Sequence, residues 1–347
     1  MKQLEITSLR KLLNKDGNIE NPGYAKKLLW EYNRENITAR KSLIKEWDYY
    51  YIGDDKCAIC LTISDLGYLG AISATVLDFE EVTQITKSAV SLFPLGKMNM
   101  PRTSVIGDAK HKIGETEVTF LNNGTTRKIF GQYAKFGKTG ETLTFNLELT
   151  DAPEESMVIA TPFTKSGRFY YNQKINCIVA DGTFSLGDKV YTLKKENGAL
   201  ATLDWGRGVW TYDNTWYWGS LQTILDDGSK FGWNIGYGFG NNTCATENML
   251  FYNGKSHKLD VVTFNIPQTT DGKDDYMSPW TFTSNDGRFE MDFQPILDRY
   301  EPIDLKVFCM IPHQVFGKFN GKAILDDGTE IIVKDKLGFA EKVHNKW

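Results

Sequence analysis

The chain has 347 residues, a formal net charge of -4 and 41% hydrophobic residues. This length fits one large domain or two ordinary ones, since single hydrophobic cores stop growing at about 250–300 residues. No domain-scale excess of Lys and Arg is present, which argues against nucleic acid as a partner. No apolar run approaches the roughly 18 residues of a membrane helix. Residues 1–14 lack the apolar core of a signal peptide, so we expect a cytoplasmic protein.

The composition favours β structure. The chain contains 16 Tyr, 20 Phe and 9 Trp, residue types that are enriched in strands and bury large areas. Many of its 31 Gly stand beside Asp, Asn or Lys, as tight turns require. We therefore expect many strands connected by short turns.

Only residues 1–46 have a helix-like pattern. Apolar residues recur at helical spacing between residues 23 and 36, at Tyr24, Leu28, Leu29 and Tyr32. From residue 47 the pattern changes to alternation and short apolar runs. The sequence therefore predicts a short, partly helical N-terminal segment followed by strands.

Strand candidates then follow one another to the end of the chain, separated by Asn-Gly and Asp-Gly turns that favour hairpins. The first set covers 47–52, 57–63, 69–78, 82–88, 117–121, 127–133, 142–149, 157–162, 169–179 and 189–193. The second set covers 216–225, 231–239, 249–252, 257–266, 280–283, 288–295, 305–325 and 330–335.

These candidates predict an all-β fold of antiparallel strands. The eight strands of the second set are enough to close a barrel that is filled by side chains or holds one small ligand. A β-sandwich is the main alternative. We place two β domains at 47–205 and 206–347, after an N-terminal segment at 1–46.

Several motifs resemble a known family. They include Asp-Leu-Gly-Tyr at 65–68, Phe-Tyr-Tyr-Asn-Gln-Lys-Ile-Asn-Cys at 169–177, Leu-Asp-Trp-Gly-Arg-Gly-Val-Trp at 203–210, Trp-Tyr-Trp-Gly-Ser at 216–220 and Gly-Phe-Ala-Glu-Lys-Val at 338–343. Together they are similar to the bacterial and fungal proteins grouped as domain of unknown function 2804. That family has no settled activity.

A more distant resemblance concerns the AttH, carotenoid hydratase and tocopherol cyclase group. Its motifs run in the same order as Tyr170-Tyr171, Asp204-Trp205-Gly206, the Trp-x-Trp pair at 216–218 and the Asp-Gly at 227–228. The resemblance implies two tandem lipocalin-like barrels of the calycin type and an isoprenoid or lipid-like ligand. Those enzymes have His directly after the Asp, whereas Trp205 occupies that position here.

The segment 204–210 contains the most unusual candidates. In one interpretation Asp204 is a proton donor with a pKa raised by burial, and Arg207 holds an anionic head group between the apolar walls of Trp205 and Trp210. In the other, Arg207 stacks on a Trp ring and pairs with Asp204, which is a structural role.

Further candidates lie on both sides of this segment. Trp216 and Trp218 share one strand face, so they line a ligand cavity or fill a core. Glu247 follows a polar loop and is a second candidate acid or ligand contact, or simply a solvated carboxylate. His313, in an apolar strand region, is a base or a satisfied core residue. Tyr171, Asn172 and Lys174, on the predicted strand 169–179, are weaker candidates.

No cofactor or metal is predicted. No phosphate-binding loop or nucleophile-elbow motif occurs. The Cys57 and Cys60 pair falls on a predicted strand with the two side chains on opposite faces, so we interpret both as buried small hydrophobes.

The favoured function is binding of a small hydrophobic or amphipathic molecule in a barrel or between the barrels. The alternatives are an isoprenoid hydratase or cyclase that uses carboxylic acid protonation, and a structural protein with solid barrels.

Overall fold

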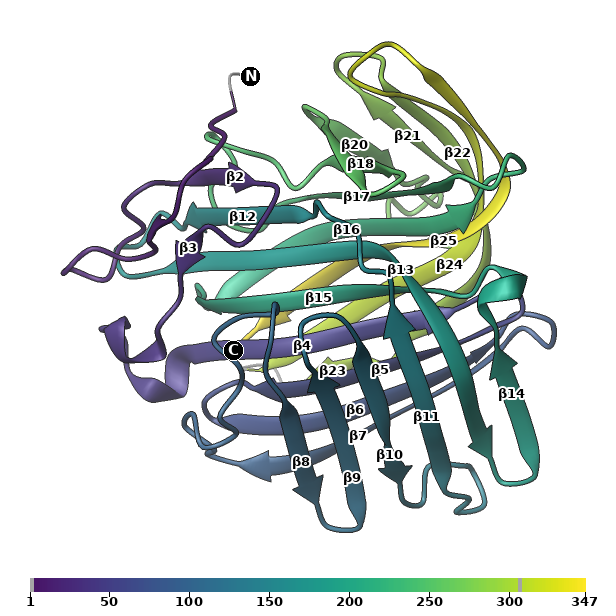
Figure 1. Cartoon of the computed structure of the whole chain (residues 1–347), viewed down its shortest axis with the longest axis horizontal. Helices are drawn as coiled ribbons and strands as arrows, with labels where there is room; N and C mark the ends of the chain where they lie inside the picture. The colour runs from purple at the N-terminus through teal and green to yellow at the C-terminus, as the bar shows by residue number, and fades with distance from the viewer. Residues whose placement is uncertain (1–2, 305–307) are drawn as a thin grey trace.

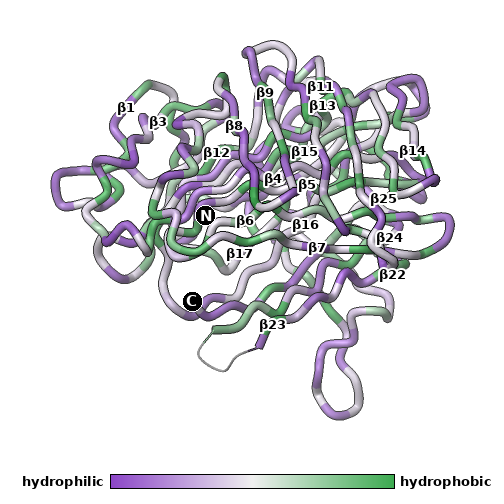
Figure 2. The backbone as a smooth tube through the Cα atoms, turned by 90° about the horizontal axis from the view of Figure 1, so that it is seen from below, coloured by the Kyte–Doolittle hydropathy of each residue, from purple (hydrophilic) through white to green (hydrophobic). Residues whose placement is uncertain are grey.

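The computed structural model describes residues 3–304 and 308–347, and it confirms the all-β fold prediction (Figure 1). One strongly curved sheet forms a nearly closed barrel, and a second sheet forms a half-barrel in tandem with it. We call them the first and second barrels. Figure 2 shows that hydrophilic residues dominate the protruding turns, whereas apolar and polar residues mix along the strands.

The first barrel has antiparallel strands in the order β7-β6-β5-β4-β15-β13-β11-β10-β9-β8, with β12 and β14 paired to β13, and β2 paired to β12. The edge strands β7 and β8 approach each other, which nearly closes the barrel. The strands are β2 (Gly23–Ala25), β4 (Ile44–Gly53), β5 (Cys57–Asp65), β6 (Leu69–Asp78), β7 (Thr83–Leu92), β8 (Ala109–Ile113), β9 (Thr116–Asn122), β10 (Arg127–Tyr133), β11 (Leu143–Thr150), β12 (Met157–Pro162), β13 (Phe169–Leu186), β14 (Lys189–Leu193) and β15 (Leu200–Val209).

The second barrel has the order β19-β18-β17-β16-β25-β24-β22-β21-β20, with β23 paired to β24. Its strands are β16 (Asp213–Ile224), β17 (Lys230–Tyr237), β18 (Met249–Tyr252), β19 (Lys255–Lys258), β20 (Val262–Asn265), β21 (Trp280–Ser284), β22 (Phe289–Tyr300), β23 (Ile303–Asp304), β24 (Cys309–Ile324) and β25 (Glu330–Lys346). The predicted strand 305–325 begins at 305–307, which lie outside the described residues.

The N-terminal segment contains little helix. Its helical part consists of two 3-10 turns, η1 (Arg34–Asn36) and η2 (Lys41–Leu43), and a third turn, η3 (Lys195–Asn197), precedes β15. The short strands β1 (Arg10–Lys11) and β3 (Trp30–Glu31) pair in parallel. The helix-like spacing between 23 and 36 instead reflects apolar side chains, among them Trp30 and Tyr32, that pack against the first barrel.

Both barrel interiors are filled with side chains. The first is packed mainly with aliphatic residues from β4, β5, β6, β11 and β13, together with Trp205 and Tyr171. The second is packed with aromatic rings, including Trp233 and Trp280, which are fully buried. These cores are therefore packed, although four members of the first core, Leu13, Trp30, Tyr32 and Tyr171, line part of a cavity of about 990 Å³.

The outer faces of the two sheets pack against each other. Tyr49 and Tyr51 on β4 contact a cluster that includes Trp218 on β16 and Phe339 on β25. Alternation explains this arrangement, because Tyr50 and the other even-numbered residues of β4 point into the first barrel. We call this contact layer the inter-barrel interface.

The cysteine prediction is confirmed. Cys57 packs in the core of the first barrel and Cys60 packs in the inter-barrel interface, so their side chains lie on opposite faces of β5. Both thiols are free and buried, and burial raises the pKa of Cys57 to about 12. Neither thiol is therefore a nucleophile at neutral pH.

Within the described ranges, no helix has the length and apolar character needed to span a membrane.

Candidate functional site

Two rows of side chains face each other across the inter-barrel interface. In the first barrel, strand pairing places Tyr49, Asp204 and Lys174 side by side on β4, β15 and β13. In the second barrel, strand pairing aligns Trp218 and Glu341 on β16 and β25. Period-two alternation turns all five side chains toward the opposing barrel.

Asp204 and Lys174 form the centre of the first row. The Lys174 ammonium lies 2.9 Å from Oδ1 of Asp204, and Nδ2 of Asn172 donates to the same oxygen at 2.6 Å. The ammonium also lies 3.9 Å from the centroid of the Trp218 ring, a cation–π contact that crosses the interface.

Glu247 reaches the interface from the loop before β18. The indole N–H of Trp218 donates to Oδ1 of Asn234 at 2.7 Å, and Nδ2 of Asn234 donates to the backbone oxygen of Glu247 at 2.9 Å. The N-terminal segment braces the same loop, because Gln3 accepts a hydrogen bond from the backbone N–H of Thr246 at 2.8 Å. Glu247 is therefore held in place from two sides.

Glu341 completes the acidic group. Its Oε1 accepts a hydrogen bond from the Trp216 indole at 2.9 Å, and its Oε2 accepts one from Nε2 of Gln314 at 3.1 Å. Arg299 in turn donates to Oε1 of Gln314 at 2.8 Å. We call Asp204, Glu247, Glu341 and Lys174 the acid cluster, since these groups influence one another electrostatically.

The carboxyls of the acid cluster are almost fully buried. Asp204, Glu247 and Glu341 are 7%, 6% and 8% exposed. Burial raises the pKa of Glu247 to about 7, an effect that Lys174 opposes and Asp204 reinforces. Burial likewise raises the pKa of Glu341 to about 7, against the stabilising hydrogen bond from Trp216. The pKa values of both carboxyls are thus shifted to near neutrality, the range in which general acids work well.

An aromatic wall adjoins the acid cluster. The rings of Tyr170 and Trp210 each lie 4.7 Å from the Phe239 ring, centroid to centroid. Trp216 lies 5.3 Å from the same ring, and Trp47 stacks on Tyr170 at 6.3 Å. Apolar walls with a few converging polar groups are typical of small-molecule sites.

Gly206 allows this wall to approach β15. A Cβ at this position would meet the Trp47 indole at 1.9 Å, far inside van der Waals contact. Any larger residue would push Trp47 away from the strand that carries Asp204. The glycine in the predicted motif therefore serves close packing.

Arg207 and Trp205 lie on the opposite face of β15, inside the first barrel. The guanidinium stacks over the Trp205 ring at 4.2 Å, which agrees with the structural interpretation of Arg207. Its ion-pair partner differs from that interpretation, because Nη2 of Arg207 binds Asp48 at 2.9 Å instead of Asp204. Residues 204 and 207 are three apart on a strand and so face opposite ways.

Tyr171 and His313 also lie away from the acid cluster. Tyr171 donates its hydroxyl to the backbone oxygen of Trp30 at 3.0 Å inside the first barrel. Nδ1 of His313 lies 2.7 Å from Asp298, and its ring is stacked between Tyr276 and Tyr300. Of the predicted site residues, the structure thus brings together Asp204, Glu247, Trp210, Trp216 and Trp218.

Sequence reasoning missed Glu341 and gave Lys174 little weight. Lys174 shares a face of β13 with Asn172, and both lie in the first part of the strand, residues 169–178, all of which are buried. Glu341 likewise interrupts a run of buried residues, Leu337 to Ala340. A charged residue inside a strand that is buried on both faces was the available signal.

No group of three or more His, Cys, Asp or Glu among residues 3–304 and 308–347 is arranged to hold a metal ion. The acid cluster contains Lys174 among its carboxylates, and an ammonium group competes with a cation for them.

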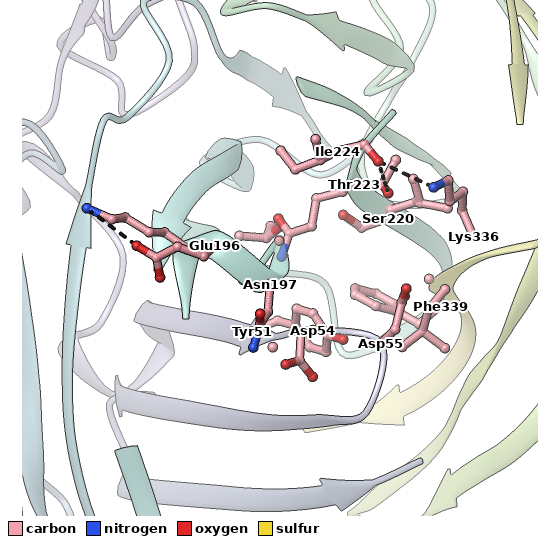
Figure 3. A pocket seen from close by; sticks show the side chains of 18 residues that line it. Tyr51, Asp54, Asp55, Glu196, Asn197, Ser220, Thr223, Ile224, Lys336 and Phe339 are labelled. Atoms are coloured by element: carbon pink, nitrogen blue, oxygen red, sulfur yellow. Dashed lines mark hydrogen bonds and ion pairs between the residues drawn. The ribbon is translucent and has the colours of Figure 1, made fainter. Parts of the chain in front are cut away.

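One cavity of about 290 Å³ lies at one end of the inter-barrel interface (Figure 3). Another, of about 990 Å³, lies beside the N-terminal segment and is lined by residues that include Trp30, Tyr32, Val105 and Tyr171. The first of these reaches the strands that carry the acid cluster.

The family described as Domain of unknown function (DUF2804) matches residues 3–347. No match to this chain is found among curated proteins. Among solved structures, a putative AttH from Nitrosomonas europaea is similar in fold, with a TM-score of 0.52, 12% identity, and coverage of 90% of this chain and 96% of that one. Kievitone hydratase from Nectria haematococca gives a TM-score of 0.47 at 9% identity over 97% of this chain and 98% of that one.

Proposed function

We propose that this chain, which belongs to the DUF2804 family, binds a small hydrophobic or amphipathic molecule at the interface between its two barrels. The observation that carries this proposal is the acid cluster, in which nearly dry carboxyls lie beside indole rings. Burying charged groups lowers stability unless ion pairs and hydrogen bonds offset the cost, and carboxyls with perturbed pKa values in an apolar setting are typical of binding and active sites. The interface is favoured over the larger cavity beside the N-terminal segment, because the acidic residues that line that cavity, Glu20 and Glu31, are exposed.

Binding can be tested with the neutral fluorescent probe N-phenyl-1-naphthylamine and the full chain. We expect saturable binding that weakens at least about tenfold in Trp218→Leu, because the variant removes an indole wall of the site. Val105→Trp provides a matched control, since Val105 is exposed and lines only the cavity beside the N-terminal segment. Loss of binding in Val105→Trp but not in Trp218→Leu would move the site away from the interface.

A second function, acid catalysis, is favoured by the pKa of about 7 at Glu247. In this scheme the Glu247 carboxyl gives its proton to a carbon of a bound double bond, and the resulting cation faces the Trp rings. Water then adds to the cation and returns a proton to the carboxylate, so the net change is hydration. Glu247 is the stronger candidate, because two N–H donors already hold Glu341.

Catalysis can be separated from binding by isotope incorporation. Geraniol is incubated with the protein in deuterium oxide, and the recovered compounds are analysed by mass spectrometry. We expect hydrated product with deuterium on carbon, reduced at least about hundredfold in Glu247→Gln, the range that general acids contribute. Equal incorporation in both proteins would exclude Glu247 as the acid, and no incorporation in either protein would leave binding as the function.

A further inference from the structure

The cavity of about 290 Å³ has both barrels in its walls. The first barrel contributes the β4–β5 turn, η3 and Thr202 on β15. The second contributes Ser220 and its neighbours on β16, and residues 336–339 on β25. Figure 3 shows Tyr51, Asp54 and Asp55 opposite Ser220 and Lys336 across this space.

The inner wall of the cavity is the next row of side chains beyond the acid cluster. This wall has four side chains. Each lies two residues along its strand from a side chain of the two rows described above, and therefore points to the same face of the sheet. The four pairs are Tyr51 with Tyr49 on β4, Thr202 with Asp204 on β15, Ser220 with Trp218 on β16, and Phe339 with Glu341 on β25. Side chains two apart on a strand are separated by about 7 Å. A single row therefore separates the cavity from the cluster.

One polar atom at this inner wall has no hydrogen-bond partner among the described residues. It is Nε2 of Gln222, although Oε1 of the same side chain accepts a hydrogen bond from Thr202. Asn176 supports the wall from behind without lining the cavity, since its Nδ2 donates to Oγ of Ser220 at 2.7 Å and to Thr202 at 3.3 Å. The amide N–H of Gln222 needs an acceptor, and a hydroxyl group accepts a hydrogen bond without bringing a charge.

The charges of the lining disfavour an anion. Asp54, Asp55 and Glu196 supply three carboxylates against two ammonium groups, Lys195 and Lys336, which leaves a net charge of -1. Both ammonium groups are already engaged, since Lys195 pairs with Glu196 at 3.9 Å and Lys336 donates to a backbone oxygen of β16 at 3.3 Å. A carboxylate or phosphate head group would thus meet carboxylates without a free cation.

We propose that this cavity is the entrance and head-group subsite of the interface site, and that it takes a neutral, hydroxylated head group. The inference rests on the proposed binding function and specifies its ligand: an amphipathic molecule with a hydroxyl-bearing head and an apolar tail. The head remains in the cavity, and the tail displaces the packed rings of Tyr51 and Phe339, whose centroids lie 5.9 Å apart, to reach Trp218.

Three probes with the same eight-carbon tail test the head-group preference. Octyl glucoside, octanoate and octyltrimethylammonium are titrated into the full chain by calorimetry, each below its critical micelle concentration. We expect octyl glucoside to bind most tightly and octanoate at least about tenfold more weakly. Octanoate binding as tightly as octyl glucoside would overturn the head-group assignment.

Variants then test the place of binding. We expect Gln222→Leu to weaken the binding of octyl glucoside about fivefold, the effect of one lost hydrogen bond. Gln222→Glu should weaken binding by the same factor, and it keeps the shape of the side chain. Gln132→Leu is the matched control, because Gln132 is an exposed glutamine of the first barrel. Equal affinities in the Gln222 variants and the control would overturn the subsite while interface binding stands. No binding of any of the three probes would overturn both proposals together.

Discussion

Replacing Glu247 with Gln should flatten the dependence of stability on pH. In the folded protein the pKa of Glu247 is about 7, whereas its ordinary value is 4.5. Between these values the folded protein holds a proton that the unfolded chain releases, so the folded state binds more protons. The contribution of Glu247 to stability therefore falls as pH rises from about 4.5 to about 7 and is constant above that range.

The magnitude follows from the two pKa values. Their difference, at about 1.36 kcal/mol for each pH unit, corresponds to about 3 kcal/mol. The Gln side chain carries no titrating proton, so the variant escapes this loss. We expect the stability of Glu247→Gln relative to the natural protein to be about 3 kcal/mol more favourable at pH 8 than at pH 4.5.

Urea denaturation followed by Trp fluorescence measures this difference, because titrating groups distant from Glu247 are common to both proteins and cancel. Lys258 is the exception, since the Glu247 carboxylate raises its pKa. Glu115→Gln, at an exposed glutamate, is the control, and its relative stability should change by less than about 0.5 kcal/mol between the two pH values. A change in Glu247→Gln no larger than that of the control would refute the burial argument for this carboxyl.

Three further variants test the buried ion pairs and the aromatic core by chemical denaturation. Lys174→Met should lower the free energy of unfolding by about 3–5 kcal/mol, because it leaves Asp204 buried without its cation. Adding Asp204→Leu should recover most of that loss, and additive effects would contradict a coupled pair. Arg207→Lys should cost about 3 kcal/mol, since Lys cannot replace the contacts to Asp48 and to three backbone oxygens; an unchanged midpoint would show that these contacts contribute little. Trp233→Ala should cost about 3–5 kcal/mol by leaving a cavity in the second barrel, and a smaller loss would indicate that the aromatic core closes around the gap.

The strand pattern was readable from the sequence, but one central strand was not. Alternation and Asp-Gly turns predicted β4, β5 and β16 close to their observed bounds. Strand β15 was missed because Asp204, Gly206 and Gly208 are poor strand formers. All ten of its residues are buried, so packing on both faces overrides local propensity.

The candidate site was predicted only in part, because it depends on pairing between distant strands. The Trp-x-Trp pattern placed Trp216 and Trp218 on one face correctly. No spacing in the sequence indicates that Glu341 lies beside Trp218, which follows from the register of β16 with β25. The register of β15 with β4 likewise places Glu46 opposite Arg207 and Asp48 opposite Trp205, so the ion pair between Arg207 and Asp48 is a diagonal one that no sequence spacing indicates. The domain division at 205/206 stays a prediction, and the strands pass from the first sheet to the second between β15 and β16.

An irregularity in β13 determines which face of the sheet each later residue of that strand points to. Its pairing with β15 shifts between Ile175 and Ile178, and Cys177 there has a φ of 62°. Both isoleucines point into the first barrel, although regular alternation would place them on opposite faces. Deleting one residue from this short stretch would therefore swap core and solvent faces for everything downstream on β13, while a conservative substitution would not. Among homologues, we expect insertions and deletions to be rarer here than changes of residue type.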